Sequence, residues 1–188
     1  MLKNTALKEL EKNSIPERYN PYPSPTHAFT TKGDHLKHFV PLKDVFKHLD
    51  EPESSEDLSQ KSYSKAKFMG KHCQGQTEIK LDGVSPTIRS EHHGNIEFRR
   101  LSIENGGKID AELKKGMKER RLTVRECALI QTFPPDYEFV IRNKKGRKGS
   151  FLVSPSQAYK IIGNAVPPLL AYNLARRIEE VWDLYFKE

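Results

Sequence analysis

One stretch of the sequence, from Arg120 to Pro134, combines charged and polar side chains that can form ion pairs and a helix cap. Arg121, Arg125 and Glu126 can pair with each other and with the segment over residues 61–119 that precedes them. Thr123 followed three residues later by Glu126 is typical of a capping box at the start of a helix. The residues of interest in this motif are Arg121, Thr123, Arg125, Glu126 and Gln131. A capped helix with solvated charges is the simpler interpretation of the same pattern.

A second stretch, Gly163-Asn164-Ala165-Val166-Pro167-Pro168, could hold a small ligand. Asn164 offers an amide, and Gly163 is expected to form a tight turn that lets the backbone approach a ligand closely. The two prolines set the direction of the final helix. Taken alone, the residues favour a loop-to-helix corner without a ligand.

These two stretches resemble the last two sequence motifs of the DNA cytosine-5 methyltransferases, in the family's order and spacing. A third stretch, residues 85–98, is similar to the end of the family's target-recognition region, where Thr87-Ile88 matches its Thr-aliphatic pair. The resemblance covers residues 61–182 firmly and the Pro-rich start loosely.

The resemblance implies a role for each motif. Residues 163–168 would help to close the pocket for S-adenosylmethionine, so the expected cofactor-binding residues are Asn164, Ala165 and Val166. Residues 120–134 would hold the target-recognition domain in shape, which makes their role structural rather than catalytic.

The residues that carry out the family's reaction have no counterpart in this sequence. The reaction needs a cysteine thiolate in a Pro-Cys dipeptide to attack carbon 6 of a flipped cytosine. Cys73 follows His72 and Cys127 follows Glu126, and no Phe-x-Gly-x-Gly segment is present. We therefore assign no catalytic residue. The chain is interpreted as the recognition part of the enzyme, either a natural subunit of a split enzyme or a gene fragment.

Contacts to double-stranded DNA are expected from basic and amide side chains, because these bind phosphates and base edges. The candidate base readers are Gln74, Gln76, Thr87, Ile88, Arg89 and His92. The candidate phosphate contacts are Lys65, Lys67, Lys71, Lys144, Lys145, Arg147 and Lys148. Each basic residue taken alone is equally explained as a solvated surface charge.

A zinc site built from His72, Cys73, His92 and His93 is a weaker alternative. Their spacing does not match the usual zinc patterns, so no metal is expected.

The elements that must position these residues follow from apolar periodicity and turn residues. Helices are predicted over residues 2–12, 39–49, 123–131 and 154–162 and from Pro168 to the end, with strands over 137–142 and 150–154. Pro134-Pro135 is expected to stop the third helix. Residues 51–60 are predicted as a loop, residues 61–100 as short strands and loops, and residues 112–121 as a basic helix or loop. The inner side of the last helix is expected to be Leu169, Leu170, Leu174, Ile178 and Val181.

The predicted fold class is α+β, with a final helix that packs on a Rossmann-like catalytic domain absent from this chain. Three domains are expected: an N-terminal segment over 1–60, a target-recognition domain over 61–154, and a cofactor motif with a docking helix over 155–188. In the isolated chain, the apolar face at Leu170, Leu174 and Ile178 should be exposed, because the catalytic half would cover it.

Composition agrees with a nucleic-acid partner without requiring one. The formal net charge is +7 and the pI is about 9.3, which also fits a basic soluble protein. The chain has no signal-like apolar start, and its two cysteines fit a reducing compartment, so a cytoplasmic protein is expected.

The predicted function is therefore sequence-specific recognition of DNA for cytosine-5 methylation, in a restriction-modification context, with the catalytic half as a separate polypeptide. Two alternatives stay open: an inactive remnant that only binds DNA, and a relative that acts on RNA.

Overall fold

The computed structural model describes residues 8, 12, 13, 16, 18, 20, 22–29, 36–90, 96–108 and 110–186. The predicted helix over 2–12, together with His92 and His93, lies outside the described residues. The chain divides into two compact units. One comprises residues 1–38 and 168–188, and the other comprises residues 39–167.

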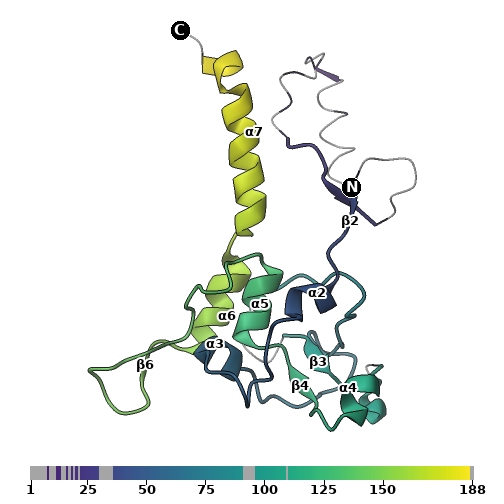
Figure 1. Ribbon diagram of the computed structural model, residues 1–188, viewed down its shortest axis with the longest axis vertical. Helices are drawn as coiled ribbons and strands as arrows, with labels where there is room; N and C mark the ends of the chain where they lie inside the picture. The colour runs from purple at the N-terminus through teal and green to yellow at the C-terminus, as the bar shows by residue number, and fades with distance from the viewer. Residues whose placement is uncertain are drawn as a thin grey trace. The chain divides into compact units, whose positions relative to one another are not determined.

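The second unit is organised around one short helix. Its helices are α2 (Leu42–Phe46), α3 (Leu58–Lys61), α4 (Asp110–Lys114), α5 (Val124–Ile130) and α6 (Pro155–Asn164). Helix α5 packs against α2, α3 and α6, and α5 and α6 run side by side in Figure 1. Every residue from Val124 to Ala128 is buried, so α5 is covered on all sides, as expected for a central helix.

Two antiparallel strand pairs complete this unit. Strand β3 (Phe98–Arg100) pairs with β4 (Arg120–Arg121), and β5 (Ile141–Arg142) pairs with β6 (Phe151–Val153). The residues between β5 and β6 form a long hairpin loop that projects away from the helices (Figure 1). Helices mixed with short strand pairs make the chain α+β, as predicted.

The hydrophobic core of the second unit joins α2, α5 and α6 with the loop segments packed around them. Its buried members include Leu42, Phe46, Ile79, Ile88, Ile96, Leu122, Val124, Cys127, Phe139, Val140, Tyr159 and Ile162. Tyr159 of α6 is fully buried, and its hydroxyl donates a hydrogen bond of 2.7 Å to the carbonyl of Leu122. A buried phenol needs such a partner, and this one ties α6 to the segment before α5.

The first unit contains helix α7 (Pro168–Phe186) and two short parallel strands, β1 (His27–Ala28) and β2 (Lys37–His38). Among the described residues of α7, only Val181 is buried. Leu169, Leu170 and Ile178 are exposed, and Leu174 is half-buried. The side that was expected to face inward therefore lies mostly open, which agrees with the exposed face expected at Leu170 and Ile178. No helix among the described residues has the length and apolar character needed to cross a membrane.

Several predicted boundaries are wrong by a few residues. Residues 58–60 were expected in a loop but begin α3, because the Asp57 carboxylate accepts the Ser59 N–H at 2.8 Å and caps the helix. Helix α5 ends at Ile130, before the prolines expected to stop it, and Thr132 has a left-handed φ of 64°. The first predicted strand of the hairpin shortens to two residues, since Phe139 and Val140 are buried in the core.

Helix α6 extends two residues further than predicted and includes Gly163 and Asn164. It packs on α5 within the second unit, whereas the expected domain boundaries grouped residues 155–167 with the final helix.

Candidate functional site

Arg121 is the most buried cation of the structural motif and binds backbone rather than carboxylates. Its side chain is fully buried and donates to the carbonyls of Ala66 at 3.1 Å, Gly75 at 2.8 Å, and Ile96. The guanidinium also lies 4.1 Å above the ring of Phe98. Burial lowers the pKa of Arg121, although an arginine remains charged. One side chain thus holds three separate loop positions against β4.

Arg120, the neighbour of Arg121 on β4, forms the buried ion pair at the start of α5. Its two terminal nitrogens lie 2.8 and 2.9 Å from the two carboxylate oxygens of Glu126, a bidentate arrangement in which both side chains are almost completely buried. Arg120 also contacts Glu51 at 3.2 Å, and Glu51 in turn contacts Arg100 at 2.6 Å. Arg100 also pairs with Glu112 at 2.7 Å.

The expected pairing among Arg121, Arg125 and Glu126 is wrong. Adjacent residues of a strand point to opposite faces, so only one of the two arginines on β4 can face Glu126, and it is Arg120. Arg125 instead contacts the Asp57 carboxylate at 2.5 Å and donates to the Tyr137 carbonyl at 2.9 Å. The contacts of Glu51 with Arg100 and Arg120 were not predicted. Glu51 lies 49 residues before Arg100 and 69 residues before Arg120, so no local pattern indicates these contacts.

The predicted capping box is present. The Thr123 hydroxyl accepts the Glu126 N–H at 3.0 Å, and the Glu126 carboxylate accepts the Thr123 N–H at 2.8 Å. The same hydroxyl donates to the Gln60 side chain at 2.6 Å, which connects α5 to α3. At the other end of α5, Gln131 donates to the Ile162 carbonyl of α6 at 3.1 Å.

Glu51 gives this network a predictable dependence on pH. Burial alone would raise the pKa of its carboxyl, but hydrogen bonds and charge from Arg100 and Arg120 outweigh burial and lower the pKa to about 2. A carboxyl with a lowered folded-state pKa stabilises the fold above its ordinary pKa of about 4.5, and this stabilisation is lost as the pH falls through about 2.

We therefore expect Glu51→Gln to cost about 1–2 kcal/mol at pH 7, which is less than the shift alone implies because the side chain is 30% exposed and screened. Urea unfolding of both proteins at a series of pH values checks this prediction. The difference between them should shrink from pH 4.5 downward, and a constant difference would contradict the assignment.

Gly163 was expected to form a tight turn, but this expectation is wrong. Gly163 is helical, and it must be glycine because the backbone of Arg89 and Ser90 crosses α6 at this point. A Cβ at Gly163 would lie 2.2 Å from the Arg89 carbonyl carbon and 2.3 Å from the Ser90 nitrogen. The cofactor motif and the end of the expected recognition segment are therefore in direct contact.

Gly163→Ala should lower the free energy of unfolding by about 1–3 kcal/mol, as overpacking does. Alanine forms helices better than glycine by about 1 kcal/mol, so helix propensity alone would make the variant more stable. A loss of stability therefore indicates the steric effect. Lys160→Ala, on the exposed side of the same helix, is the control and should stay within about 0.5 kcal/mol. Stabilisation by Gly163→Ala would mean that residues 89–90 move away freely.

The three expected cofactor residues follow one another at the end of α6. Asn164 is its last residue and is exposed, Ala165 is half-buried, and the Val166 side chain is 62% exposed. An open carboxamide next to an apolar side chain can form one wall of a pocket for a polar, partly apolar cofactor. These three residues therefore fit one wall of a cofactor pocket, and further surfaces are needed to enclose the cofactor.

The expected base readers divide into accessible and engaged side chains. Gln76 is 3% exposed and its carboxamide accepts the Met69 N–H at 2.9 Å, so this side chain supports its own loop instead of facing solvent. Ile88 is a core residue, and Arg89 pairs with Glu97 at 3.0 Å. Gln74 and Thr87 are exposed.

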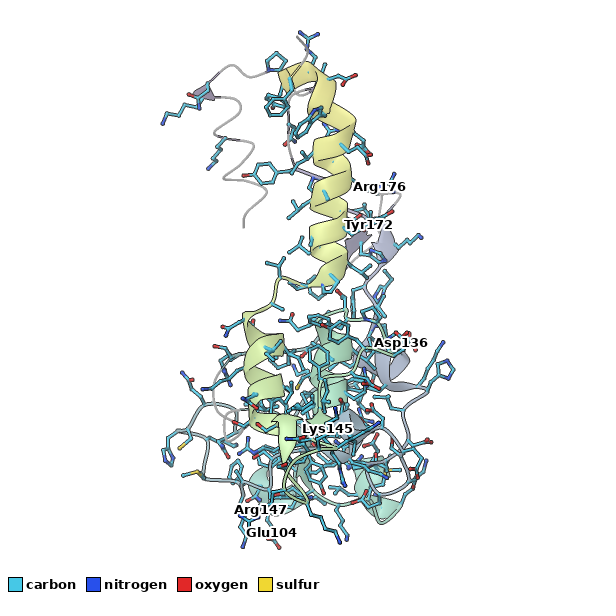
Figure 2. The ribbon with its side chains drawn as sticks, turned by 90° about the vertical axis from the view of Figure 1, so that its left-hand side faces the viewer. Glu104, Asp136, Lys145, Arg147, Tyr172 and Arg176 are labelled. Carbon is cyan, nitrogen blue, oxygen red and sulfur yellow. The ribbon has the colours of Figure 1, made fainter. Side chains whose placement is uncertain are left out.

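The basic loop between β5 and β6 is exposed and has a defined backbone. The Asn143 side chain accepts the N–H groups of Lys145 at 3.1 Å and Gly146 at 2.9 Å, which fixes the turn. Lys145 and Arg147 are labelled in Figure 2. The exposed cations of the loop are Lys144, Lys145, Arg147 and Lys148. Among the described residues, no ion pair neutralises these four cations.

Neither cysteine is an evident nucleophile. Cys127 is fully buried in α5, and burial raises its pKa well above the ordinary value, so its thiol stays protonated and out of reach. Cys73 is half-buried in the loop that Arg121 anchors at Gly75. Within the described part of the chain, no group of three or more His, Cys, Asp or Glu residues is arranged to hold a metal ion.

Comparison with known proteins agrees with this geometry. The family model of the C-5 cytosine-specific DNA methylases matches residues 4–180. The chain belongs to this family. The residues that match the family model include the buried arginine motif, the end of α6 and the basic hairpin loop.

Bacterial type II methyltransferases are among its curated relatives. It is 44% identical to M.FnuDI of Fusobacterium nucleatum over 61 residues, which are 32% of this chain and 14% of that protein. It is 44% identical to M.NgoPII of Neisseria gonorrhoeae over 80 residues, 42% of this chain and 20% of that protein. It is 43% identical to M.AquIB of Picosynechococcus over 63 residues, 34% of this chain and 45% of that protein. The matches thus span less than half of each relative.

Proposed function

We propose that this chain is the DNA-recognition part of a DNA (cytosine-5)-methyltransferase of a restriction-modification system, active only together with a catalytic half. The observation that carries the proposal is the set of bonds from Arg121 to Ala66, Gly75 and Ile96. These bonds anchor three loop positions on a buried scaffold, while Gln74, which adjoins Gly75, and Thr87 remain exposed. A rigid scaffold that presents polar side chains is suited to reading DNA.

A separate catalytic half is proposed because the reaction needs a nucleophile. In this family a cysteine thiolate attacks carbon 6 of cytosine, and S-adenosylmethionine supplies the methyl group. The buried and protonated Cys127 cannot perform this attack. One relative is itself a short protein, which supports a methyltransferase made of separate chains. The 63 aligned residues make up 45% of M.AquIB, whereas the 80 aligned residues make up only 20% of M.NgoPII.

The catalytic half would complete two surfaces of this chain. Asn164, Ala165 and Val166 would form one wall of the S-adenosylmethionine pocket, with the Asn164 carboxamide positioned to bind a polar group of the cofactor. The exposed apolar side chains of α7, including Ile178 and Trp182, would pack on a Rossmann-like catalytic domain. An apolar helix face of this extent is stabilised by such a partner.

The basic hairpin loop is proposed to contact DNA phosphates. Lys145→Ser with Arg147→Ser should weaken binding to duplex DNA about tenfold and reduce the slope of log affinity against log salt by about 2, since each neutralised phosphate contributes about 0.9. Fluorescence anisotropy at several salt concentrations measures both quantities. The control is Lys47→Ser with Lys115→Ser, which removes two exposed charges elsewhere. Equal loss in the two double variants would show a general charge effect instead of a contact.

The decisive experiment is methyl transfer from radiolabelled S-adenosylmethionine to DNA, by this chain alone and co-expressed with the product of the gene immediately upstream. Activity only in the pair supports the proposal. Activity of this chain alone would show that it contains a nucleophile and would contradict the proposal. Silence in both, with DNA still bound, would favour a DNA-binding remnant, and transfer to tRNA in parallel reactions would redirect the proposal to RNA.

A further inference from the structure

A pocket in the second unit lies apart from the cofactor motif and from the basic hairpin loop. Its volume is about 790 Å³, which is in the range of sites for small organic ligands. Three segments form it: Lys71, residues 76–83, and part of residues 101–108. None of these segments contains a residue of the cofactor motif or of the basic loop.

The walls of this pocket are held in place by two carboxylates. Glu78 accepts the backbone N–H groups of Leu101 at 2.9 Å and Lys108 at 2.6 Å. Glu119 accepts the Ser102 N–H at 2.6 Å and the Asn105 amide at 3.1 Å. The loop over residues 101–108 is therefore clamped at both ends, and a loop fixed in this way can bind a ligand with little loss of entropy.

Two glycines shape the loop over residues 101–108. Gly107 has no room for a side chain, since a Cβ would lie 2.0 Å from the Leu101 carbonyl oxygen. Gly106 has a φ of 86°, and a Cβ there would lie 3.6 Å from Lys71 Nζ. The Lys71 ammonium thus lies against the facing loop, at the edge of the pocket.

The pocket combines cations at its edge with apolar side chains in its floor. Lys71, Lys80 and Lys108 are exposed, and among the described residues no ion pair engages their ammonium groups. The apolar floor consists of Ile79, Leu81 and Leu101, of which Leu81 is half-buried and offers the side-chain surface, while Ile79 and Leu101 are each only 2% exposed. The two acids of the lining are already engaged.

Glu78 binds the backbone N–H groups of the clamped loop, and Asp82 pairs with Lys43 at 2.8 Å. Positive charge therefore prevails at the edge of the pocket.

We propose that this pocket binds a single nucleotide, with its phosphate on Lys71, Lys80 and Lys108 and its base against the apolar floor. A phosphate matches the three ammonium groups, and a flat base matches an apolar wall that a free anion would leave uncovered. The nucleotide could be free or part of a DNA strand. The site does not depend on methyl transfer: a free nucleotide would go beyond the proposed function, whereas a nucleotide of a DNA strand would rest on it.

The test is a titration of the ¹⁵N-labelled full chain with dGMP, followed by backbone amide NMR shifts. Saturable shifts are expected at Lys71 and residues 106–108. Lys71→Glu with Lys108→Glu should weaken the binding about tenfold or more, since each reverses a contact to phosphate. Lys47→Glu with Lys115→Glu, two exposed lysines outside the pocket lining and the basic hairpin loop, is the matched control and should leave dGMP binding unchanged. Circular dichroism of each variant verifies that it folds.

Two further titrations separate the sources of the ligand. Duplex DNA that shifts the same amides and competes with dGMP would place a DNA nucleotide in the pocket, and absence of competition would leave the free nucleotide as the ligand. Both outcomes support the site. Inorganic phosphate that binds as tightly as dGMP would overturn the role of the apolar floor. Absence of any saturable shift in the folded protein would overturn the proposal, whatever the methyl-transfer assay shows.

Discussion

Arg121→Ala is expected to lower the free energy of unfolding of the second unit by about 3–5 kcal/mol. Three buried carbonyls, those of Ala66, Gly75 and Ile96, would each lose a donor, and an unsatisfied buried polar group costs about 1–3 kcal/mol. The contact of the guanidinium with the Phe98 ring is lost as well. Water that enters the vacated space can bind some of these carbonyls, so the expected loss of stability is smaller than the sum of the separate costs.

Urea unfolding followed by far-ultraviolet circular dichroism measures this loss. Tryptophan fluorescence is unsuitable, because the single tryptophan, Trp182, belongs to α7 of the other unit. Arg142→Ala is the matched control, since that arginine is exposed on β5 and its removal should change stability by about 0.5 kcal/mol or less. Arg121→Lys should fall between the two, as an ammonium cannot reach all three carbonyls. A loss below about 1 kcal/mol for Arg121→Ala would contradict the anchoring role.

Glu126→Ala should cost a similar amount, about 3–5 kcal/mol, for a different reason. The substitution leaves the buried Arg120 without its bidentate partner and with only the partly exposed Glu51 as a counter-charge, and breaking a buried ion pair at one partner is strongly destabilising. It also removes the acceptor for the Thr123 N–H, so α5 loses half of its capping box. Glu126→Gln keeps an acceptor oxygen and should therefore cost less, about 1.5–3 kcal/mol.

A double variant separates these two effects. Arg120→Met with Glu126→Leu replaces the pair by apolar side chains and should destabilise by less than the sum of the two single changes, because no charge is left unpaired. The recovery will be incomplete, since Glu51 also loses a contact to Arg120. Additive effects in urea unfolding would show that Arg120 and Glu126 do not stabilise the fold as a pair.

The local elements of this protein were predicted well from the sequence because neighbouring residues determine them. The capping box of Thr123 and Glu126 depends on a spacing of three residues, and the structure has both of its hydrogen bonds. The basic hairpin loop follows from its glycines and from Asn143, whose side chain binds backbone only two and three residues away. The family resemblance also came from contiguous motifs, and the match over residues 4–180 agrees with it.

Only the tertiary structure decided which charges pair and which polar side chains are buried. Glu51 lies in a segment predicted as a loop, yet it contacts Arg100 and Arg120 from far away in the chain. Gln76 looks like a surface amide in the sequence but is buried beneath its own loop.

Gly163 is required because of the distant backbone of Arg89, a constraint that no local pattern could reveal. Hydrogen-bond spacing within a helix or turn is determined locally, whereas burial and ion pairing depend on which distant segments the folded chain brings together. The sequence by itself therefore determined the family, the capped start of α5 and the basic loop, and the tertiary structure decided the buried network that holds them.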